Sequence, residues 1–444
     1  MQKQQSSGGA GPHVAILAYP FGSHPSPLFA VTRGLASAAP NALFSFLCPG
    51  KCNSLAMSQQ VPSNIKAYNV WDGAPEGNGM EDIESFMRVE LAVFKKGVEV
   101  AVAETGRKLS CLVSDAFVRV GKQIAEENGV AWVTFFASGA ASLSSHVYTD
   151  LIRQHYGTAA GEDETLNFIP GMSNVRIRDL PEGIVTGDLE SGFSRMLHEM
   201  SKELHQATAV FINSCEELHP TITDDMKSKF KKLLSVGPLL FSTPPATVPD
   251  SHGCLPWLDK QKPATVAYIA FGSGVIPPPN ELVALAEALE ASRVPFIWSL
   301  RDRAKEHLPS GFVDSANGMV VPWAPQMDVL SHGAVGVFIS HGGFNSMLET
   351  IASEVPMIVR PFFGDHMING RMVEAVWEIG VVVKGGIFTK NDIMNCLDMA
   401  LAQENGRKWR KNLKAIKEMA LTAVGPQGSS AKNFKALLDL VSNY

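Results

Sequence analysis

Residues 340–346 read Ser-His-Gly-Gly-Phe-Asn-Ser and follow an apolar stretch directly. A helix that opens at such a run points bare backbone N–H groups and the positive end of its dipole beyond the strand, where an anion can bind. His341 and Ser346 add side-chain donors, and Ser273 stands between two glycines at the end of another apolar stretch. The pattern predicts a diphosphate site. By themselves, the two glycines are equally typical of a plain strand-to-helix turn.

A candidate base lies near the N-terminus. His24 follows the first apolar stretch, and Asp115 ends a later one. Histidine titrates near neutral pH, so it can take the proton of an attacking hydroxyl, and a carboxylate would fix its tautomer and stabilise the imidazolium. A lone histidine and a distant aspartate are more often an unrelated surface pair, so this interpretation needs context.

Other chemistries lack their essential residues. No G-x-S-x-G nucleophile elbow is present, which disfavours a covalent hydrolase. Residues 198–202 start like a zinc-binding helix but place Lys202 where the second histidine belongs, and no Asp-x-Asp pair could hold a metal diphosphate. No G-x-G-x-x-G follows the first strand, which disfavours a dinucleotide-dependent oxidoreductase. We therefore expect a direct displacement with inversion at the carbon that is attacked. We expect neither a metal nor a permanently bound cofactor.

The bulk properties describe an ordinary folded enzyme. The chain has 444 residues, 45% hydrophobic and 18% charged, with a formal net charge of −6 and no basic block, so we expect two domains and no nucleic-acid partner. Six scattered cysteines without a CxxC pair suit a reducing compartment. The apolar run at 14–19 is too short for a membrane span. We expect a soluble, cytoplasmic protein, by default a monomer.

The elements that must position these residues alternate between strand and helix. Continuous apolar strands between helices predict two similar α/β halves, each with a doubly wound parallel sheet. The expected strands are 13–19, 42–48, 109–113, 131–136, 265–271, 295–300, 336–340 and 356–359. The expected helices are 28–38, 97–107, 120–128, 280–292 and 345–353. Ligands bind beyond the carboxyl ends of such strands. The candidate residues at those ends are His24, Asp115, Ser273, His341 and Asp365.

The segment 323–366 carries the context that the single motifs lack. It begins Trp-Ala-Pro-Gln, contains Glu349 and ends at Asp365 and His366, in the spacing and length of a known signature. It resembles the plant secondary-product signature of the family-1 UDP-glycosyltransferases. The similarity extends to residues 20–24, 72–77, 114–117, 167–171 and 360–365, and residues 142–150 are most similar to the flavonoid and anthocyanidin 3-O-glycosyltransferases.

This resemblance implies a GT-B fold of two Rossmann-like domains that face each other across a cleft. It implies an acceptor-binding domain at 1–240, a Pro-rich linker at 241–252, a UDP-sugar-binding domain at 253–430, and a C-terminal helix at 431–444 that packs back on the first domain. The implied reaction moves a hexose from a UDP-sugar to the 3-hydroxyl of a flavonol or anthocyanidin, with His24 as general base assisted by Asp115.

The resemblance also assigns the binding residues. Trp323 would stack on uracil, Ala324 and Gln326 would bind the base and ribose, and Glu349 would accept from the ribose hydroxyls. The residues implied for the diphosphate are Ser273, His341, Asn345 and Ser346. Those implied for the sugar are Asp365, His366 and the backbone near Phe344. Those implied for the acceptor are Phe21, Ser23, Phe117, His146 and Phe363.

Four positions depart from the family pattern. The usual His-Cys-Gly-Trp-Asn-Ser is here His-Gly-Gly-Phe-Asn-Ser, so Gly342 is expected to loosen the turn and Phe344 to remove an indole. Ala137 replaces a threonine that approaches the sugar, and Ser138 would compensate only through a backbone shift. The usual final glutamine is His366, which favours galactose over glucose. The alternatives are a non-catalytic UDP-sugar-binding protein and a transferase for another plant phenolic acceptor.

Overall fold

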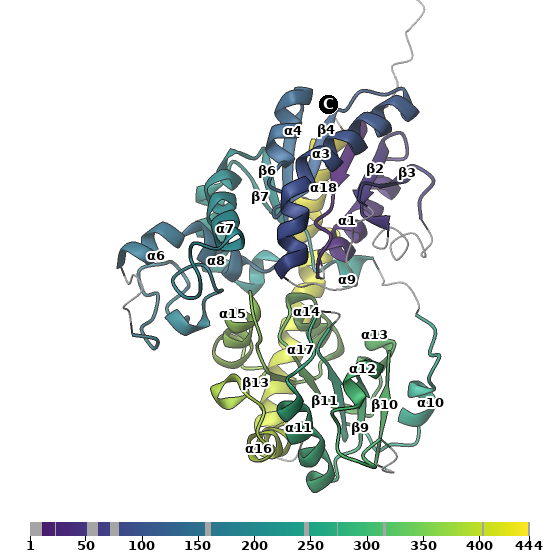
Figure 1. Ribbon diagram of the computed structural model, residues 1–444, viewed down its shortest axis with the longest axis vertical. Coiled ribbons are helices and arrows are strands. Elements are labelled where there is room, and N and C mark those ends of the chain that lie inside the picture. Colours follow the sequence, from purple (N-terminus) through teal and green to yellow (C-terminus); the bar gives the residue numbers. More distant parts are fainter. Residues whose placement is uncertain are drawn as a thin grey trace, which may run out of the picture.

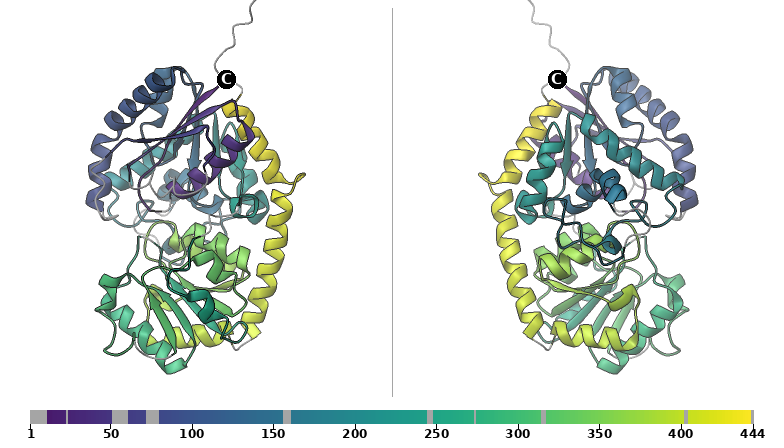
Figure 2. Two further views of the ribbon diagram at one scale, coloured as in Figure 1. Left: turned by 90° about the vertical axis from the view of Figure 1, so that its right-hand side faces the viewer. Right: turned by 90° about the vertical axis from the view of Figure 1, so that its left-hand side faces the viewer.

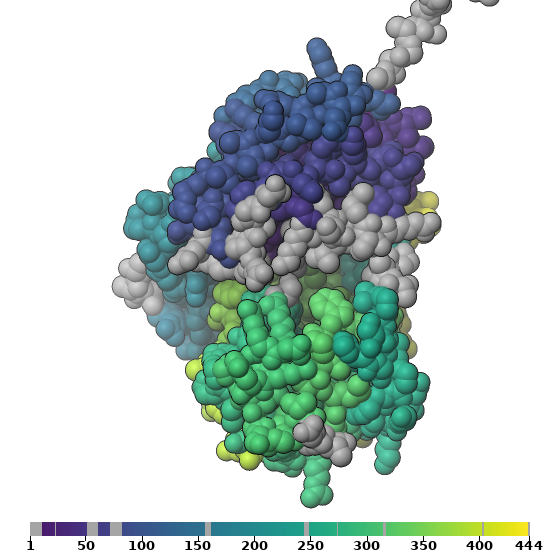
Figure 3. All heavy atoms as spheres, turned by 45° about the vertical axis from the view of Figure 1, so that its right-hand side comes forward, coloured from purple at the N-terminus to yellow at the C-terminus, as the bar shows by residue number. Residues whose placement is uncertain are grey.

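The computed structural model describes residues 11–22, 24–50, 61–71, 80–155, 161–243, 248–272, 274–313, 317–401 and 404–442. Ser23, Ser273, Cys52 and the 72–77 motif lie outside these residues. The described chain forms two α/β lobes stacked along the long axis of the molecule (Figure 1), and the space-filling view places the purple and blue first lobe above the green second lobe (Figure 3).

The first lobe is built on a seven-stranded parallel sheet in the order β3-β2-β1-β4-β5-β6-β7. Most of its strands are buried on both faces, which explains why they read as continuous apolar runs. The strands are β1 His13–Leu17, β2 Leu43–Cys48, β3 Ile65–Asn69, β4 Cys111–Asp115, β5 Ala131–Phe136, β6 Ala209–Ile212 and β7 Leu233–Ser235. The helices are α1 Pro25–Ala38, α3 Met80–Thr105, α4 Gly121–Asn128, α5 Ala140–Val147, α6 Thr149–His155, α7 Gly192–Glu203, α8 Pro220–Lys229 and α9 Leu239–Ser242, with short turns η2 Ile177–Asp179, η3 Leu204–Gln206 and η4 Glu216–Leu218.

The second lobe repeats this architecture with a six-stranded parallel sheet in the order β10-β9-β8-β11-β12-β13. Its strands are β8 Val266–Ala270, β9 Phe296–Ser299, β10 Gly318–Val321, β11 Val335–Ser340, β12 Met357–Val359 and β13 Gly380–Val382. Its helices are α10 Cys254–Leu258, α11 Pro279–Ser292, α12 Asp302–Lys305, α13 Gln326–Leu330, α14 Phe344–Ser353, α15 His366–Arg371 and α16 Lys390–Leu401, with turns η5 Met372–Val376 and η6 Lys384–Gly386. Two doubly wound parallel sheets confirm the predicted fold class.

The last two helices, α17 Glu404–Val424 and α18 Ser429–Ser442, connect the lobes. They form the yellow arm that runs along one side of the molecule from the second lobe to the first (Figure 2). α18 packs beside β7, where Ser430 Oγ donates to the carbonyl of Gly237 at 2.6 Å and Asn433 Nδ2 donates to Glu216 Oε1 at 2.8 Å. The domain boundaries at residues 240 and 253 stay predictions, since residues 244–247 are not described.

The helix expected at 97–107 is the largest correction, because α3 begins at Met80 and is far longer. Its buried stripe includes Phe86, Glu90 and Phe94 at four-residue spacing. Glu90 interrupts the apolar pattern in the sequence, yet it is buried and accepts from Arg119 Nε at 2.6 Å. Burial raises the pKa of Glu90, although Arg119 opposes that shift. A paired buried charge therefore concealed a helical stripe.

Two further properties concern the described residues alone. None of their helices is long and apolar enough to cross a membrane. The five cysteines among them are all buried: Cys48, Cys111, Cys215, Cys254 and Cys396. Burial raises the pKa of the Cys111 thiol to about 12, so this cysteine is not a nucleophile at neutral pH.

Candidate active site

A cavity of about 570 Å³ opens where the carboxyl ends of the two sheets face each other. The first lobe contributes Gly22 and His24 from the loop after β1. The second lobe contributes most of the lining, including Trp323, Gln326, His341, Asn345, Ser346, Glu349, Phe363, Asp365 and His366. Residues from both halves of the chain therefore meet in one place, as the strand-end rule predicts.

His24 and Asp115 form a hydrogen-bonded pair at the first-lobe side of this cavity. Strand β1 pairs with β4, so the loop after β1 runs beside the end of β4, where Asp115 lies. His24 Nδ1 is 2.9 Å from Asp115 Oδ2, and Asp115 Oδ1 accepts the backbone N–H of Phe117 at 2.9 Å. Because an ionised carboxylate only accepts, the proton sits on Nδ1, and Nε2 keeps a free lone pair.

The surroundings of His24 tune it as a base. Its ring lies 5.1 Å from the ring of Tyr19 and 4.7 Å from that of Phe117, and its side chain is 19% exposed. Burial lowers the pKa of His24, but the charge and hydrogen bond of Asp115, with a smaller effect from the charge of Asp365, raise it above its ordinary value overall. Asp115 is fully buried, so its charge is poorly screened. The arrangement can accept a proton and stabilise the resulting imidazolium.

The glycines around His341 are required by close packing. Strand β11 ends at Ser340, and α14 begins at Phe344 with Gly343 at its N-cap. A Cβ on Gly272 would lie 3.0 Å from the His341 ring, and one on Gly343 would lie 2.4 Å from its Nε2. Burial lowers the pKa of His341 to about 3, with a further lowering by His366, so its imidazole is neutral at physiological pH. The first turn of α14 and a neutral imidazole donor therefore face the cavity together.

Gly342 corrects the expectation of a loosened turn. Its φ of +82° belongs to the left-handed region, and a Cβ there would lie 2.6 Å from Val359 Cγ1. Its carbonyl accepts from Asn369 Nδ2 at 3.0 Å. The turn is thus tightly enclosed. Only glycine adopts its left-handed backbone conformation without strain and fits the space beside Val359.

The predicted uridine residues lie together at one end of the cavity. Trp323 is 61% exposed, an unusual state for an indole and one that leaves its face open for stacking. Gln326 Nε2 donates to Glu349 Oε2 at 2.5 Å, and Tyr268 donates to Gln326 Oε1 at 3.2 Å. Desolvation raises the pKa of Glu349 to about 7, although its bond with Gln326 lowers it. Ala324 is buried beside them.

The predicted sugar residues cluster at the start of α15. Asp365 occupies the N-cap position of this helix without a side-chain capping bond, and His366 is the first helical residue. His366 Nδ1 accepts the backbone N–H of Phe363 at 3.4 Å, and its ring lies 4.7 Å from that of His341. Burial lowers the pKa of His366 to about 4, with a smaller lowering by Arg360. His366 is therefore neutral and keeps its Nε2–H as a donor.

Phe344 and Ser138 link this end of the cavity to the first lobe. Phe344 is buried and does not line the cavity, because its ring lies against Gly139, where a Cβ would come within 2.5 Å. Ser138 Oγ donates to Asp365 Oδ2 at 2.5 Å. Ser138, which follows Ala137, therefore contacts the carboxylate of Asp365, a residue that is predicted to bind the sugar.

The predicted acceptor residues are only partly gathered. Phe363 is 52% exposed and lines the cavity, and Phe117 contacts the ring of His24. Phe21 is buried in an aromatic cluster with Tyr19 and Phe86, away from the cavity lining. His146 is buried against Phe136, and burial lowers its pKa to about 4. The geometry thus favours Phe363 and Phe117 over Phe21 and His146 for direct contact.

Sequence reasoning missed three residues of this site. Tyr268 reaches Gln326 from the middle of β8, a position that carries no signal. Asn369 donates to Asp365 Oδ2 at 2.9 Å from one helical turn away, a spacing that could have been noticed. Arg301 lines the cavity just after β9, where the strand-end rule would have found it. Within the described residues, no cluster of three or more histidine, cysteine or acidic side chains could hold a metal ion.

Comparisons with known proteins place this chain in a recognised group. Residues 249–419 match the family model of UDP-glucoronosyl and UDP-glucosyl transferases. The chain is 55% identical to the anthocyanidin 3-O-glucosyltransferase of Vitis vinifera and 48% identical to the anthocyanidin 3-O-galactosyltransferase of Actinidia chinensis var. chinensis, with 97% of each chain covered. A crystal structure of a UDP-glucose:anthocyanidin 3-O-glucosyltransferase in complex with UDP superposes with a TM-score of 0.92 at 41% identity, covering 98% of this chain and 99% of that one.

Proposed function

The chain belongs to the UDP-glucoronosyl and UDP-glucosyl transferase family, and we propose that it moves a hexose from a UDP-sugar to the 3-hydroxyl of a flavonol or anthocyanidin. The observation that carries this proposal is the hydrogen-bonded pair of His24 and Asp115 beside one cavity. The same cavity is lined by the predicted uridine residues Trp323 and Glu349 and by the predicted sugar residues Asp365 and His366. The acceptor class follows from relatives that are named for anthocyanidins and cover nearly the whole chain.

In the proposed reaction, His24 Nε2 takes the proton of the acceptor hydroxyl. The oxygen attacks the anomeric carbon from the face opposite the diphosphate, the bond to the diphosphate breaks, and UDP leaves with the electron pair. The sugar is therefore transferred with inversion. Asp115 holds the imidazole in the tautomer that leaves Nε2 free and stabilises the positive charge that develops on the ring.

The diphosphate would be held by the second lobe without a metal ion. Asn345 and Ser346 lie in the first turn of α14, where backbone N–H groups and the helix dipole favour negative charge. His341 adds a neutral N–H donor beside them. If these hydrogen bonds are stronger to the departing UDP than to the intact UDP-sugar, they lower the barrier to transfer.

We further propose galactose as the preferred hexose, with glucose second. The neutral His366 keeps one donor, Nε2–H, at the sugar end of the cavity, whereas a glutamine would present a donor and an acceptor. One hydrogen bond of this kind can change donor preference about tenfold. A competition between UDP-galactose and UDP-glucose on quercetin, with the wild type and His366→Gln, tests this proposal. Equal preference in both proteins would remove the role assigned to His366.

A matched pair of variants tests the catalytic role of the first lobe. His24→Ala should lose turnover and keep its affinity for UDP, since the uridine residues all lie in the second lobe. His155→Ala is the control, because His155 stacks on Phe168 in the first lobe and does not line the cavity. Turnover by His24→Ala within a few-fold of wild type would refute the assignment of the base.

A further inference from the structure

We propose that Ser138 and Arg371 are positioning residues for the donor sugar: they fasten the two ends of α15 to the first lobe and so hold the Asp365 carboxylate in place. The inference rests on the proposed function, because it takes Asp365 as the group that binds the sugar hydroxyls. It adds that the lobe assigned to the acceptor also sets the geometry of donor recognition.

The first fastening joins the N-terminal end of α15 to the loop between β5 and α5. Ser138 is nearly buried, and its hydroxyl donates to Asp365 Oδ2 at 2.5 Å across 227 positions of the chain. Asn369 Nδ2 donates to the same oxygen at 2.9 Å. No other donor to the carboxylate of Asp365 is found in the described part of the chain, so Oδ1 remains available to accept from sugar hydroxyls. Two bonds to one oxygen fix the plane of the carboxylate.

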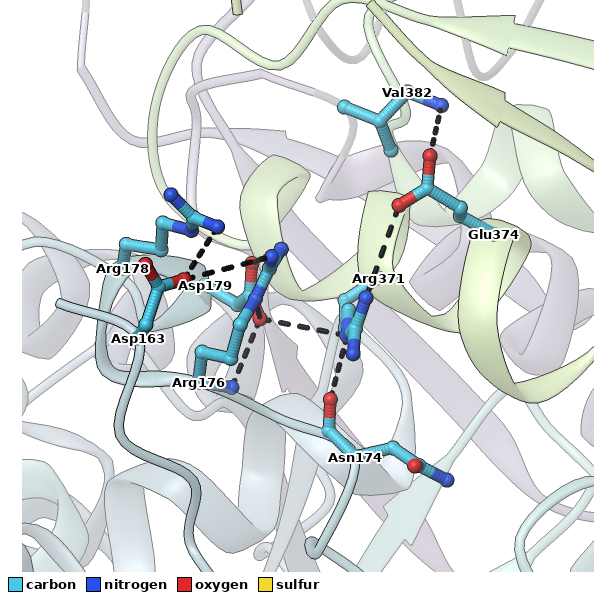
Figure 4. A network of polar contacts seen from close by, with 8 residues as sticks. All are labelled: Asp163, Asn174, Arg176, Arg178, Asp179, Arg371, Glu374 and Val382. Atoms are coloured by element: carbon cyan, nitrogen blue, oxygen red, sulfur yellow. Dashed lines mark hydrogen bonds and ion pairs between the residues drawn. The ribbon is translucent and has the colours of Figure 1, made fainter. Parts of the chain in front are cut away.

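The second fastening lies at the opposite end of the same helix. Arg371 is the last residue of α15, and its Nε donates to the carbonyl of Asn174 at 2.5 Å. The same nitrogen lies 3.7 Å from Asp179 Oδ2, a carboxylate that Arg176 already holds through two bonds of 2.7 and 2.8 Å. Figure 4 shows Arg371 reaching from its helix towards Asn174 and Asp179.

The second lobe anchors Arg371 as well. Arg371 Nη1 lies 3.8 Å from Glu374 Oε2, and Glu374 Oε1 accepts the backbone N–H of Val382 on β13 at 3.1 Å. The guanidinium therefore bridges the sheet of the second lobe and the 161–180 segment of the first (Figure 4). Arginine suits this position because its several fixed donors can serve partners on two sides at once.

The length of α15 makes these contacts relevant to the sugar site. The helix has only six residues, a rise of about 9 Å, so a displacement at Arg371 is transmitted to Asp365. Asn369, in the same helix, also bonds to the carbonyl of Gly342 in the loop that precedes α14. Asp365 and His24 line the same cavity, and the charge of Asp365 is one of the causes that raise the pKa of His24. Fastening α15 to the first lobe thus sets the donor against the base.

Substitutions at Ser138 give the first test. Ser138→Ala should raise the KM for the UDP-hexose about tenfold, since a hydrogen bond to a charged group is lost. The Kd for UDP should stay within twofold, because Asp365 is assigned to the sugar and not to the nucleotide. Ser138→Thr keeps the hydroxyl and should restore most of the wild-type KM. An unchanged KM in Ser138→Ala, or an equal loss of UDP affinity, would overturn the proposal.

Substitutions at Arg371 give the second test. Arg371→Ala should raise the KM for the UDP-hexose several-fold and leave the Kd for UDP within twofold, and Arg371→Lys should recover part of the loss. Arg178→Ala is the matched control, since the guanidinium of Arg178 pairs with Asp163 inside the first lobe. Equal effects of Arg371→Ala and Arg178→Ala on the KM would refute the proposal that Arg371 holds α15 in place.

A double-mutant cycle separates the contact between Ser138 and Asp365 from other effects of each single substitution. Ser138→Ala and Asp365→Ala should be non-additive in the affinity for a UDP-hexose measured by calorimetry, because each removes one partner of the same contact. Additive effects would contradict the proposal. The failure of the proposed function is distinguishable, since wild type would then form no glycoside, whereas failure of this inference leaves wild-type transfer intact.

Discussion

Asp115→Asn tests how the buried carboxylate acts on His24. Asp115 Oδ1 accepts the backbone N–H of Phe117 at 2.9 Å, so the amide oxygen of an asparagine would keep that bond and turn its NH₂ towards His24. The imidazole would then have to accept at Nδ1, which moves its proton to Nε2. With that nitrogen protonated in most molecules, His24 would take the proton of the acceptor hydroxyl only from the minor tautomer, which carries the residual activity.

The size and direction of the effect follow from this geometry. General-base assistance contributes typically 10²–10⁴-fold, so we expect kcat to fall roughly 10²–10³-fold, about 3–4 kcal/mol of barrier. In the wild type, activity falls as the pH drops through the raised pKa of His24, because the base becomes protonated. In the variant, the contribution of Asp115 is gone while burial remains, so the acidic limb of the profile should move to lower pH.

The assay is steady-state glycoside formation from pH 5 to 9 at saturating donor and acceptor. The melting temperature and the Kd for UDP serve as controls, since Asp115 is fully buried and does not line the cavity. The double variant with His24→Ala should be no slower than His24→Ala alone, because Asp115 acts through His24. A kcat within threefold of wild type, or a loss confined to KM, would refute the tautomer argument.

Three further predictions concern the second lobe. UDP binding should release a proton near pH 7, because ribose hydroxyls favour the ionised form of Glu349, whose pKa is about 7. The affinity for UDP should therefore rise from pH 6 to pH 8. Calorimetric binding enthalpies that do not depend on the buffer would disprove this proton release. Trp323→Ala should weaken UDP binding about 5- to 100-fold with little change in kcat at saturating donor, since base stacking is worth about 1–3 kcal/mol; unchanged fluorescence titrations would argue against stacking. Gly342→Ala should lower the free energy of unfolding by about 1–3 kcal/mol in urea, because its φ is +82° and Val359 leaves no room; an unaltered midpoint would contradict the enclosed turn.

The sequence predicts this fold well where the apolar pattern is uninterrupted. Strand β5 has the expected bounds of 131–136, and β8, β9, β11 and β12 lie within one or two residues of expectation. The pattern fails at α3, because Glu90 is buried with Arg119 and reads as a surface residue. A charge that is paired across the fold has no local signature.

The site divides along a similar line. The segment 323–366 is local in sequence, so its uridine and sugar residues could be recognised together. The contact between Ser138 and Asp365 joins two lobes and is invisible to any spacing rule. The sequence also does not predict which of two loop aromatics is exposed. Phe21 is buried in an aromatic cluster, whereas Phe363 lines the cavity.

The structure of the product tests the central proposal most directly. Purified protein, quercetin and an α-configured UDP-hexose should yield one flavonol 3-O-hexoside with the β configuration at its anomeric carbon, together with one equivalent of UDP. Proton NMR of the isolated product reports both the position and the anomeric configuration. An α-linked product would contradict direct displacement by a His24-activated hydroxyl, and UDP release without any glycoside would contradict transfer itself.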